Sequence, residues 1–263
     1  MHLKRIATAA LLLPLFYFYI MKLPEAFFLA LLLTLSVVAQ WEFYSMYHVS
    51  GLMKNSGMFS GVLALLSAYL LQRPFAPVLI YSFMAIFVIR LFGKRDPVSS
   101  LRDVSSTVLA VLYIPGLLSF QLSLRHDRPE WIIFLFGCVW IADSFAYYIG
   151  KAVGKRKLYA AVSPNKTVAG AVGSLLGGCL AGWFLDAVLV HALGGWRAVA
   201  GGLVIGAVTI VGDLVESMFK RDAGVKDSSN IIPGHGGILD KIDGVLFAGP
   251  VFYWVSRAMG VIV

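Results

Sequence analysis

The chain has 263 residues, of which 59% are hydrophobic and only 14% are charged, and its formal net charge is +8. Soluble proteins are about 45–50% apolar and about 25% charged, so this composition, which also leaves no long polar stretch, excludes a soluble globular domain. The basic residues lie in short loops between apolar runs, which favours membrane topology and contact with anionic lipids over nucleic-acid binding. The sequence therefore predicts an integral membrane protein.

The chain has 2 cysteines, Cys138 and Cys179, and both lie within apolar runs. Their number and spacing fit neither a disulfide framework nor a metal site, so we expect packed free thiols. Residues 1–20 resemble a signal peptide in their basic start and apolar core. Because no cleavage site is evident, we expect them to form a retained first span.

Apolar runs recur along the whole chain. A helix needs about 20 predominantly apolar residues to cross a bilayer, and spans are helical because hydrocarbon offers backbone groups no hydrogen-bond partner. We therefore predict an all-α, polytopic fold with about nine transmembrane helices. The candidate spans are residues 6–21, 26–45, 58–72, 76–93, 105–122, 131–150, 168–190, 198–216 and 244–262.

Lysine and arginine are unevenly distributed between the loops. Placing the N-terminus in the cytoplasm puts most of the 22 Lys and Arg residues on the cytoplasmic side, as the positive-inside rule requires. We therefore predict a multi-pass protein of the cell inner membrane. Its N-terminus and its polar loops 151–167 and 217–243 would face the cytoplasm.

The two parts of the chain differ in polar content, although we expect them to form one membrane domain. Residues 1–130 are mainly apolar spans joined by short basic loops, and we interpret them as a scaffold in which Glu42 and His48 are interfacial residues. Residues 131–263 contain both polar loops and several acidic residues within or beside spans. We predict that this second part carries the functional site.

Small residues recur in the last spans. The seventh span carries small residues at four-residue spacing, and the eighth carries two more: Gly170, Ser174, Gly178 and Gly182, then Gly202 and Gly206. Such spacing lets helices approach closely. We therefore predict a tightly packed frame around the polar loops.

Acidic residues near the ends of spans are candidates for a functional site. Asp143 lies within the sixth span, where an ionisable group is costly and is therefore a functional candidate; a pair with a loop lysine is the alternative. Asp213 and Glu216 share a helix face at i, i+3, as do Asp240 and Asp243. Each pair suits a hard cation such as Mg²⁺, and an ion pair with a nearby lysine or arginine is the alternative.

The loop 217–243, SMFKRDAGVKDSSNIIPGHGGILDKID, combines the groups that a phosphate-rich substrate requires. Lys220, Arg221 and Lys226 offer phosphate contacts, the acid pairs flank the loop, and the Pro-Gly-His-Gly-Gly turn lets backbone N–H groups approach an anion. We interpret His235 as a phosphate or metal-water contact, with a base or a structural hydrogen-bonding residue as the alternatives. The combination favours a metal–phosphate site.

The loop 151–167 reads KAVGKRKLYAAVSPNKT, and its first part fits a basic membrane-surface patch. Its last part places Ser163, Asn165 and Lys166 at the start of the seventh span, where a helix N-terminus suits an anion. The same residues also suit an ordinary helix cap.

Together, the two loops resemble the signature of the phosphatidate cytidylyltransferases, also called CDP-diacylglycerol synthases. The resemblance covers about residues 131–263, whereas residues 1–130 are similar to the family only in hydropathy. The matching positions are Asp143 to Tyr147, Gly154-Lys155, Lys157-Leu158, Ser163-Pro164-Asn165-Lys166-Thr167, Ser217, Lys220-Arg221, Lys226-Asp227, Pro233-Gly234-His235-Gly236-Gly237, Asp240 and Asp243.

The resemblance implies a membrane enzyme that needs Mg²⁺ and joins phosphatidic acid and CTP, giving CDP-diacylglycerol and pyrophosphate. The lipid phosphate would attack the α-phosphorus of CTP, and pyrophosphate would leave in line. A homodimer is also consistent with the resemblance. The expected roles are metal binding by Asp213 and Asp240, phosphate contacts from Lys220, Arg221, Lys226 and His235, substrate contacts or metal support from Asp227, Gly236, Gly237, Lys241 and Asp243, and CTP contacts from Asp143, Ser163, Asn165 and Lys166.

Two other functions stay open. The first is a related membrane enzyme that uses CTP on another lipid, such as a polyprenol-type kinase, but the complete signature favours the cytidylyltransferase. The second is an ion-coupled transporter, for which paired broken helices in two related halves are expected. No such symmetry is visible in the sequence.

Two positions depart from the family pattern. Lys241 stands where the signature usually has arginine, which keeps the charge but removes the option of a bidentate phosphate contact. Ala169 stands where the family commonly has glutamate after the Ser-Pro-x-Lys-Thr motif.

Restoring the family's glutamate tests whether Ala169 limits the reaction. We expect Ala169→Glu to leave the rate of CDP-diacylglycerol formation unchanged or to raise it, because the family pattern places a carboxylate there. Steady-state rates of the purified variant and wild type, with the same lipid and CTP, measure the effect. A sharp fall in rate would show that this site is built differently from those of its relatives.

Overall fold

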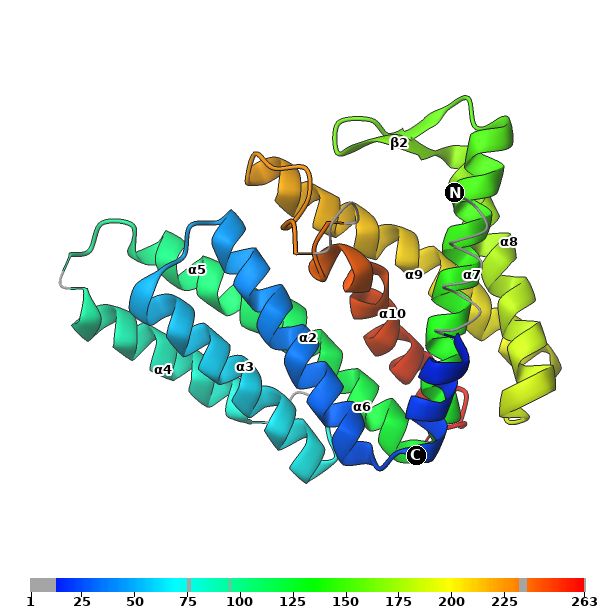
Figure 1. Ribbon diagram of the computed structural model, residues 1–263, viewed down its shortest axis with the longest axis horizontal. Helices are drawn as coiled ribbons and strands as arrows, with labels where there is room; N and C mark the ends of the chain where they lie inside the picture. Colours follow the sequence, from blue (N-terminus) through cyan, green and yellow to red (C-terminus); the bar gives the residue numbers. More distant parts are fainter. Residues whose placement is uncertain (1–12, 75–76, 95, 232–235, 263) are drawn as a thin grey trace.

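The computed structural model describes residues 13–74, 77–94, 96–231 and 236–262, and it is almost entirely helical (Figure 1). A first helical segment covers residues 13–22. The elements after it are α2 (Glu25–Met46), α3 (Gly51–Leu71), α4 (Val78–Gly93), α5 (Ser100–Val111), the π-helix η1 (Leu112–Gly116), α6 (Leu117–Asp127), α7 (Glu130–Val153), β1 (Lys157–Tyr159), β2 (Ser163–Thr167), α8 (Val168–Leu185), the π-helix η2 (Asp186–Val190), α9 (Gly195–Asp222) and α10 (Leu239–Ala258).

The predicted all-α, polytopic class is confirmed. The candidate spans 58–72, 76–93 and 244–262 fall on α3, α4 and α10, respectively. Residues 6–12 of the first candidate lie outside the described part. The number of nine crossings therefore stays a prediction. Among the described residues, 5 helical stretches are long and apolar enough to cross a membrane, namely Glu25–Met46, Ser100–Asp127, Glu130–Val153, Val168–Val190 and Gly195–Asp222.

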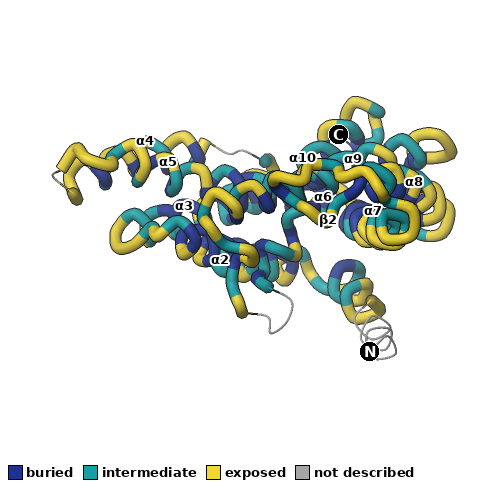
Figure 2. Tube along the Cα trace, turned by 90° about the horizontal axis from the view of Figure 1, so that it is seen from above, coloured by how far each residue is buried: buried dark blue, intermediate teal, exposed yellow. Residues whose placement is uncertain are grey.

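Large apolar side chains are exposed along the outer faces of several helices, and Figure 2 shows exposed residues along α4 and α8. Phe87 and Leu91 on α4 and Leu176, Leu180 and Trp183 on α8 are all more than half exposed. Soluble monomers rarely expose apolar surface of this extent. These faces are therefore the ones that meet lipid in a multi-pass membrane protein.

The helices form two adjoining groups that share the larger of two hydrophobic core clusters, while the smaller cluster lies among α3, α4 and α5. In Figure 1, α2 to α6 lie together on one side, whereas α7, α8, α9 and α10 pack on one another in turn. Buried side chains from both groups, including Phe43, Trp131 and Phe252, belong to the same core cluster. The division at residue 130 into a scaffold and a functional part stays a prediction.

The contact between α8 and α9 depends on glycines. A Cβ atom on Gly202 would overlap the backbone carbonyl oxygen of Gly178, and one on Gly206 would lie 2.5 Å from the carbonyl oxygen of Ser174. The Ser174 hydroxyl donates to the Gly206 carbonyl oxygen at 2.9 Å. The backbones therefore touch directly, as the small-residue spacing predicts.

The loop 151–167 contains a short antiparallel hairpin rather than only irregular turns. Lys157 pairs with Thr167, and Tyr159 pairs with Ser163. The hairpin leads directly into α8, where the Thr167 hydroxyl accepts the Gly170 N–H at 3.1 Å and caps the helix. Figure 1 places the hairpin at the same end of the molecule as the end of α9 and the start of α10, so both polar loops lie together.

Neighbouring glycines on α9 provide a matched test of this packing. Gly202→Ala should destabilise the protein by about 1–3 kcal/mol, as overpacking typically does, because the new methyl group meets the Gly178 backbone. Gly201→Ala is the control, since its Cβ would lie 3.6 Å or more from the nearest side-chain atoms. Thermal unfolding in detergent measures both variants. Equal stability of the two would contradict the close α8–α9 contact.

Candidate active site

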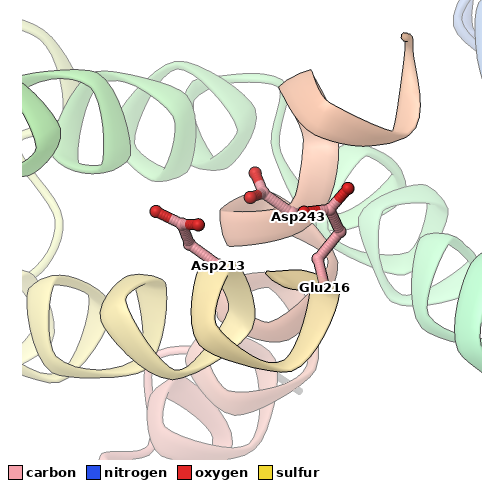
Figure 3. Close-up of side chains that lie close together, drawn as sticks. All are labelled: Asp213, Glu216 and Asp243. Atoms are coloured by element: carbon pink, nitrogen blue, oxygen red, sulfur yellow. The ribbon is translucent and has the colours of Figure 1, made fainter. Parts of the chain in front are cut away.

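Three carboxylates converge where α9 meets α10. Asp213 and Glu216 lie on α9 and Asp243 lies on α10, with ligand oxygens all within 4.8 Å of one another (Figure 3). The helices come close here because α9 has Gly212 at the contact, where a Cβ would lie 2.6 Å from the backbone oxygen of Asp243. Such a concentration of negative charge inside a membrane protein requires compensation by cations.

Lys220 joins the two helices through ion pairs. Its ammonium contacts the fully buried carboxylate of Glu216 and lies 2.5 Å from Oδ1 of Asp240, in the first turn of α10. Lys220 itself is 9% exposed. The aliphatic part of its side chain is thus enclosed, while its charge compensates acids from both helices.

Asp240 is held by further hydrogen bonds besides the Lys220 pair. Its Oδ2 accepts the backbone N–H of Gly237 at 2.7 Å and both the N–H and the hydroxyl of Ser228, at 3.1 and 2.9 Å. Burial alone would raise the pKa of this carboxyl, but the Lys220 ammonium and the Gly237 N–H outweigh burial and hold the pKa at about 2. Asp240 therefore stays ionised at neutral pH.

A cavity of about 520 Å³ lies beside the acid cluster. Asp143 from α7, Asn165 and Lys166 from β2, and Asp213 from α9 all line it. The Lys166 ammonium lies 2.5 Å from Oδ2 of Asp213. The hairpin thus delivers an amide and a cation to a space bordered by two carboxylates, an arrangement that suits a polar substrate carrying phosphate groups.

The hairpin is tied to the helices that carry the acids. Arg221, near the end of α9, donates from Nε to the carbonyl oxygen of Val162 in the hairpin turn at 3.2 Å. Its Nη1 donates to the carbonyl oxygen of Val225 at 3.1 Å. Arg221, expected to contact phosphate, therefore makes backbone contacts that connect the two polar loops.

The structure brings some of the predicted site residues together and leaves others apart. Asp240 does not lie in the acid cluster with Asp243, so the i, i+3 pair on α10 is divided between two environments. Lys226, Asp227 and Lys241 are exposed, and His235 lies outside the described residues. The residues brought together are Asp143, Asn165, Lys166 and Asp213 around the cavity, Asp213 and Asp243 in the acid cluster, and Lys220 with Asp240 and Gly237 at the start of α10.

Two residues of the first part of the chain were not predicted to belong to this region. Glu42, expected at the membrane interface, is instead 0% exposed and hydrogen-bonded to the loop before α10. Tyr113, on η1, is buried, and its hydroxyl has no hydrogen-bond partner among the described residues. Its ring packs against Phe219 on α9 and Phe247 on α10. The signal for Glu42 was the same as that for Asp143, namely an acid inside an apolar run.

The fold and the site define a polytopic membrane protein in which carboxylates and lysines meet in one site at one end of the helix bundle. The family model of the cytidylyltransferases matches residues 3–259, and the chain therefore belongs to the cytidylyltransferase family. This match confirms the resemblance found in the sequence and extends it into the first part of the chain.

Curated relatives match roughly half of the chain. The phosphatidate cytidylyltransferase of Brucella abortus is 44% identical over 148 residues, which are 55% of this chain and 54% of the relative. That of Haemophilus influenzae is 38% identical over 169 residues, 61% of this chain and 58% of the relative. That of Synechocystis is 48% identical over 126 residues, 46% of this chain and 41% of the relative. The chain spans about half the length of the curated relatives it matches.

Removing the Lys220 ammonium, which lies between α9 and α10, should destabilise the protein strongly. Lys220→Met keeps most of the side-chain volume but leaves Glu216 and Asp240 without their shared partner. Breaking a buried ion pair on one side costs about 3–5 kcal/mol. Thermal unfolding in detergent measures the effect, with Lys226→Met as the exposed control. If the two variants unfolded at the same temperature, Lys220 would not be needed to compensate these acids.

Proposed function

We propose that the protein transfers a cytidylyl group from CTP to phosphatidic acid, giving CDP-diacylglycerol and pyrophosphate. The observation that carries the proposal is the cavity in which Lys166, Asn165 and two carboxylates meet, directly beside the acid cluster of α9 and α10. Membership of the cytidylyltransferase family and the names of the relatives support it.

The acid cluster fits a bound Mg²⁺. Asp213, Glu216 and Asp243 offer oxygen ligands within 4.8 Å of one another, and the buried oxygens of Glu216 have no hydrogen-bond donor among the described residues apart from the Lys220 ion pair. Hard oxygen ligands of this kind are those Mg²⁺ prefers. When bound, Mg²⁺ would neutralise charge on the phosphate oxygens during the transfer.

The proposed metal set differs from the one expected from the signature. Asp213 is common to both, but both oxygens of Asp240 are already engaged by Lys220, Ser228 and Gly237. Glu216 pairs with Lys220 through Oε2 only, and Asp243 lies with Glu216 and Asp213 in the acid cluster, so these two acids are the partners proposed for Asp213. A direct metal contact by Asp240 stays a prediction.

The chain's own residues would orient the substrates for an in-line displacement. Lys166 and Asn165 would contact the CTP phosphates in the cavity, and the nearby carboxylates would hold Lys166 in place. An oxygen of the lipid phosphate would form the new bond to the α-phosphorus while the bond to pyrophosphate breaks. Because a lipid phosphate is ionised near neutral pH, no general base is needed, and positioning with charge neutralisation would supply the catalysis.

The location of the site supports a membrane-surface reaction. Both polar loops lie at one end of the bundle (Figure 1), and the positive-inside bias favours the cytoplasmic face of the inner membrane, where CTP is available. The acyl chains of the lipid would remain in the bilayer. Formation of a homodimer is part of the same proposal.

The first test is a product assay with the purified protein, phosphatidic acid, CTP and Mg²⁺. We expect equal amounts of CDP-diacylglycerol and pyrophosphate from the wild type. Asp240→Asn should lower kcat by about 10²–10³-fold, the loss typical when one preorganised electrostatic contact is removed. Asp222→Asn, a substitution of an exposed acid at the end of α9, is the matched control.

The products and the variants separate the possible outcomes. Size-exclusion chromatography and thermal unfolding show whether Asp240→Asn is folded. Near-normal activity of that folded variant would remove Asp240 from the site. Transfer of phosphate rather than cytidylate, or activity only with another lipid acceptor, would overturn the proposed reaction in favour of a related CTP-dependent enzyme.

A further inference from the structure

Glu42 connects the first part of the chain to the site. It lies near the end of α2 and is 0% exposed. All of its hydrogen-bond partners among the described residues lie far away in the sequence, in the loop that precedes α10 and in the first residues of that helix. An ionisable group in such a position is costly to bury, so its contacts must compensate for lost hydration.

Four donors surround the Glu42 carboxylate. Oε1 accepts from the Ser229 hydroxyl at 2.6 Å and from the Ile238 N–H at 2.9 Å. Oε2 accepts from the Ser228 hydroxyl at 3.2 Å and from the Leu239 N–H at 2.8 Å. Glu42 therefore binds this loop both before and after residues 232–235, which the structure does not describe.

The start of α10 depends on this remote carboxylate. The N-cap residue, Ile238, has no side-chain capping bond of its own, and Glu42 accepts N–H groups that a local cap would otherwise satisfy. In the described part of the chain no lysine, arginine or histidine forms an ion pair with Glu42. The N-terminal end of the α10 dipole supplies the favourable electrostatic contact instead.

The same contacts reach Asp240 through one side chain. The Ser228 hydroxyl lies 3.2 Å from Glu42 Oε2 and 2.9 Å from Asp240 Oδ2, and its backbone N–H also bonds Asp240. The packing is close, because a Cβ on Gly237 would lie 2.5 Å from Glu42 Oε1. A shift of Glu42 would therefore move Ser228 and the first turn of α10 together.

We propose that Glu42 is a positioning residue for the cytidylyl transfer: anchored in α2, it fixes the first turn of α10 and so sets the positions of Asp240 and Asp243 relative to α9. This inference rests on the proposed function. It assigns part of the site's geometry to a helix that the sequence signature does not include. Glu42 touches neither cavity nor acid cluster, so it acts through α10.

The test compares Glu42→Gln with wild type in the same detergent. Glutamine keeps the shape, but its amide nitrogen cannot accept a hydrogen bond, so one N–H of Ile238 or Leu239 loses its partner. We expect kcat per folded molecule to fall about 10- to 100-fold, as small displacements of catalytic groups do. The KM for CTP should change less than kcat, because the cavity proposed for CTP is lined by α7, the β1–β2 hairpin, α8 and α9, and not by α10.

Hydrogen exchange provides a readout that does not depend on activity. Peptides covering residues 236–243 should exchange faster in Glu42→Gln than in wild type, while peptides from α8 remain unchanged. Glu42→Asp, which keeps the negative charge and two acceptor oxygens, should recover part of both the kcat and the protection.

Gln40→Ala is the matched control. Gln40 is also 0% exposed on α2, but it donates to Gly57 and Tyr44 within the first part of the chain. Gln40→Ala should lower the unfolding temperature without a selective change in hydrogen exchange at residues 236–243. If Glu42→Gln behaved like this control, with normal kcat per folded molecule, the positioning role would be overturned and a general packing role would replace it.

The outcomes also separate this inference from the proposed function. A wild type that yields no CDP-diacylglycerol while Glu42→Gln still loosens residues 236–243 would overturn the reaction and retain the anchoring of α10. Normal catalysis by the wild type with unchanged exchange in Glu42→Gln would retain the reaction and overturn the anchoring.

Discussion

Burial of negative charge at the crossing of α9 and α10 is the constraint on which the rest of the structure depends. Carboxylates from the two helices face one another within a helix bundle whose outer faces are apolar. Each acid must find a cation or N–H donors, since an uncompensated charge in such surroundings is expensive. Lys166 compensates Asp213, and Lys220 compensates Glu216 and Asp240. The clustered oxygens near Asp243 leave an arrangement suited to a further cation.

The backbone contacts of the glycines make this crossing possible. Gly212 allows α9 to approach the backbone at Asp243, while Gly178 and Gly202 bring α8 against α9. Because α8 begins at the hairpin through its Thr167 cap, the close α8–α9 contact also fixes where Lys166 enters the cavity. Packing between small residues of α8 and α9 thus helps to set the distance between Lys166 and Asp213.

The first part of the chain is more than a lipid-facing scaffold. Glu42 from α2 accepts backbone N–H groups at the start of α10. The Tyr113 ring packs against Phe219 on α9 and Phe247 on α10. Tyr113 lies on a π-helix that also contains Pro115, an irregularity often found near functional sites. The family match across residues 3–259 agrees with a site whose frame includes both parts.

The sequence by itself determined the membrane class, the positions of the helices and the two polar loops, because apolar runs of bilayer length and the fixed spacing of polar residues are local properties. It also predicted that the small residues in spans 168–190 and 198–216 would let helices approach closely, although not which glycines meet. Only the tertiary structure decided which acids meet. Asp240 and Asp243 share a spacing that predicts one face, yet the first pairs with Lys220 and the second faces Asp213 and Glu216. Glu42 and Ser228 are separated by 186 positions, and a contact over that distance depends on how the helices pack, which no local pattern of residues encodes.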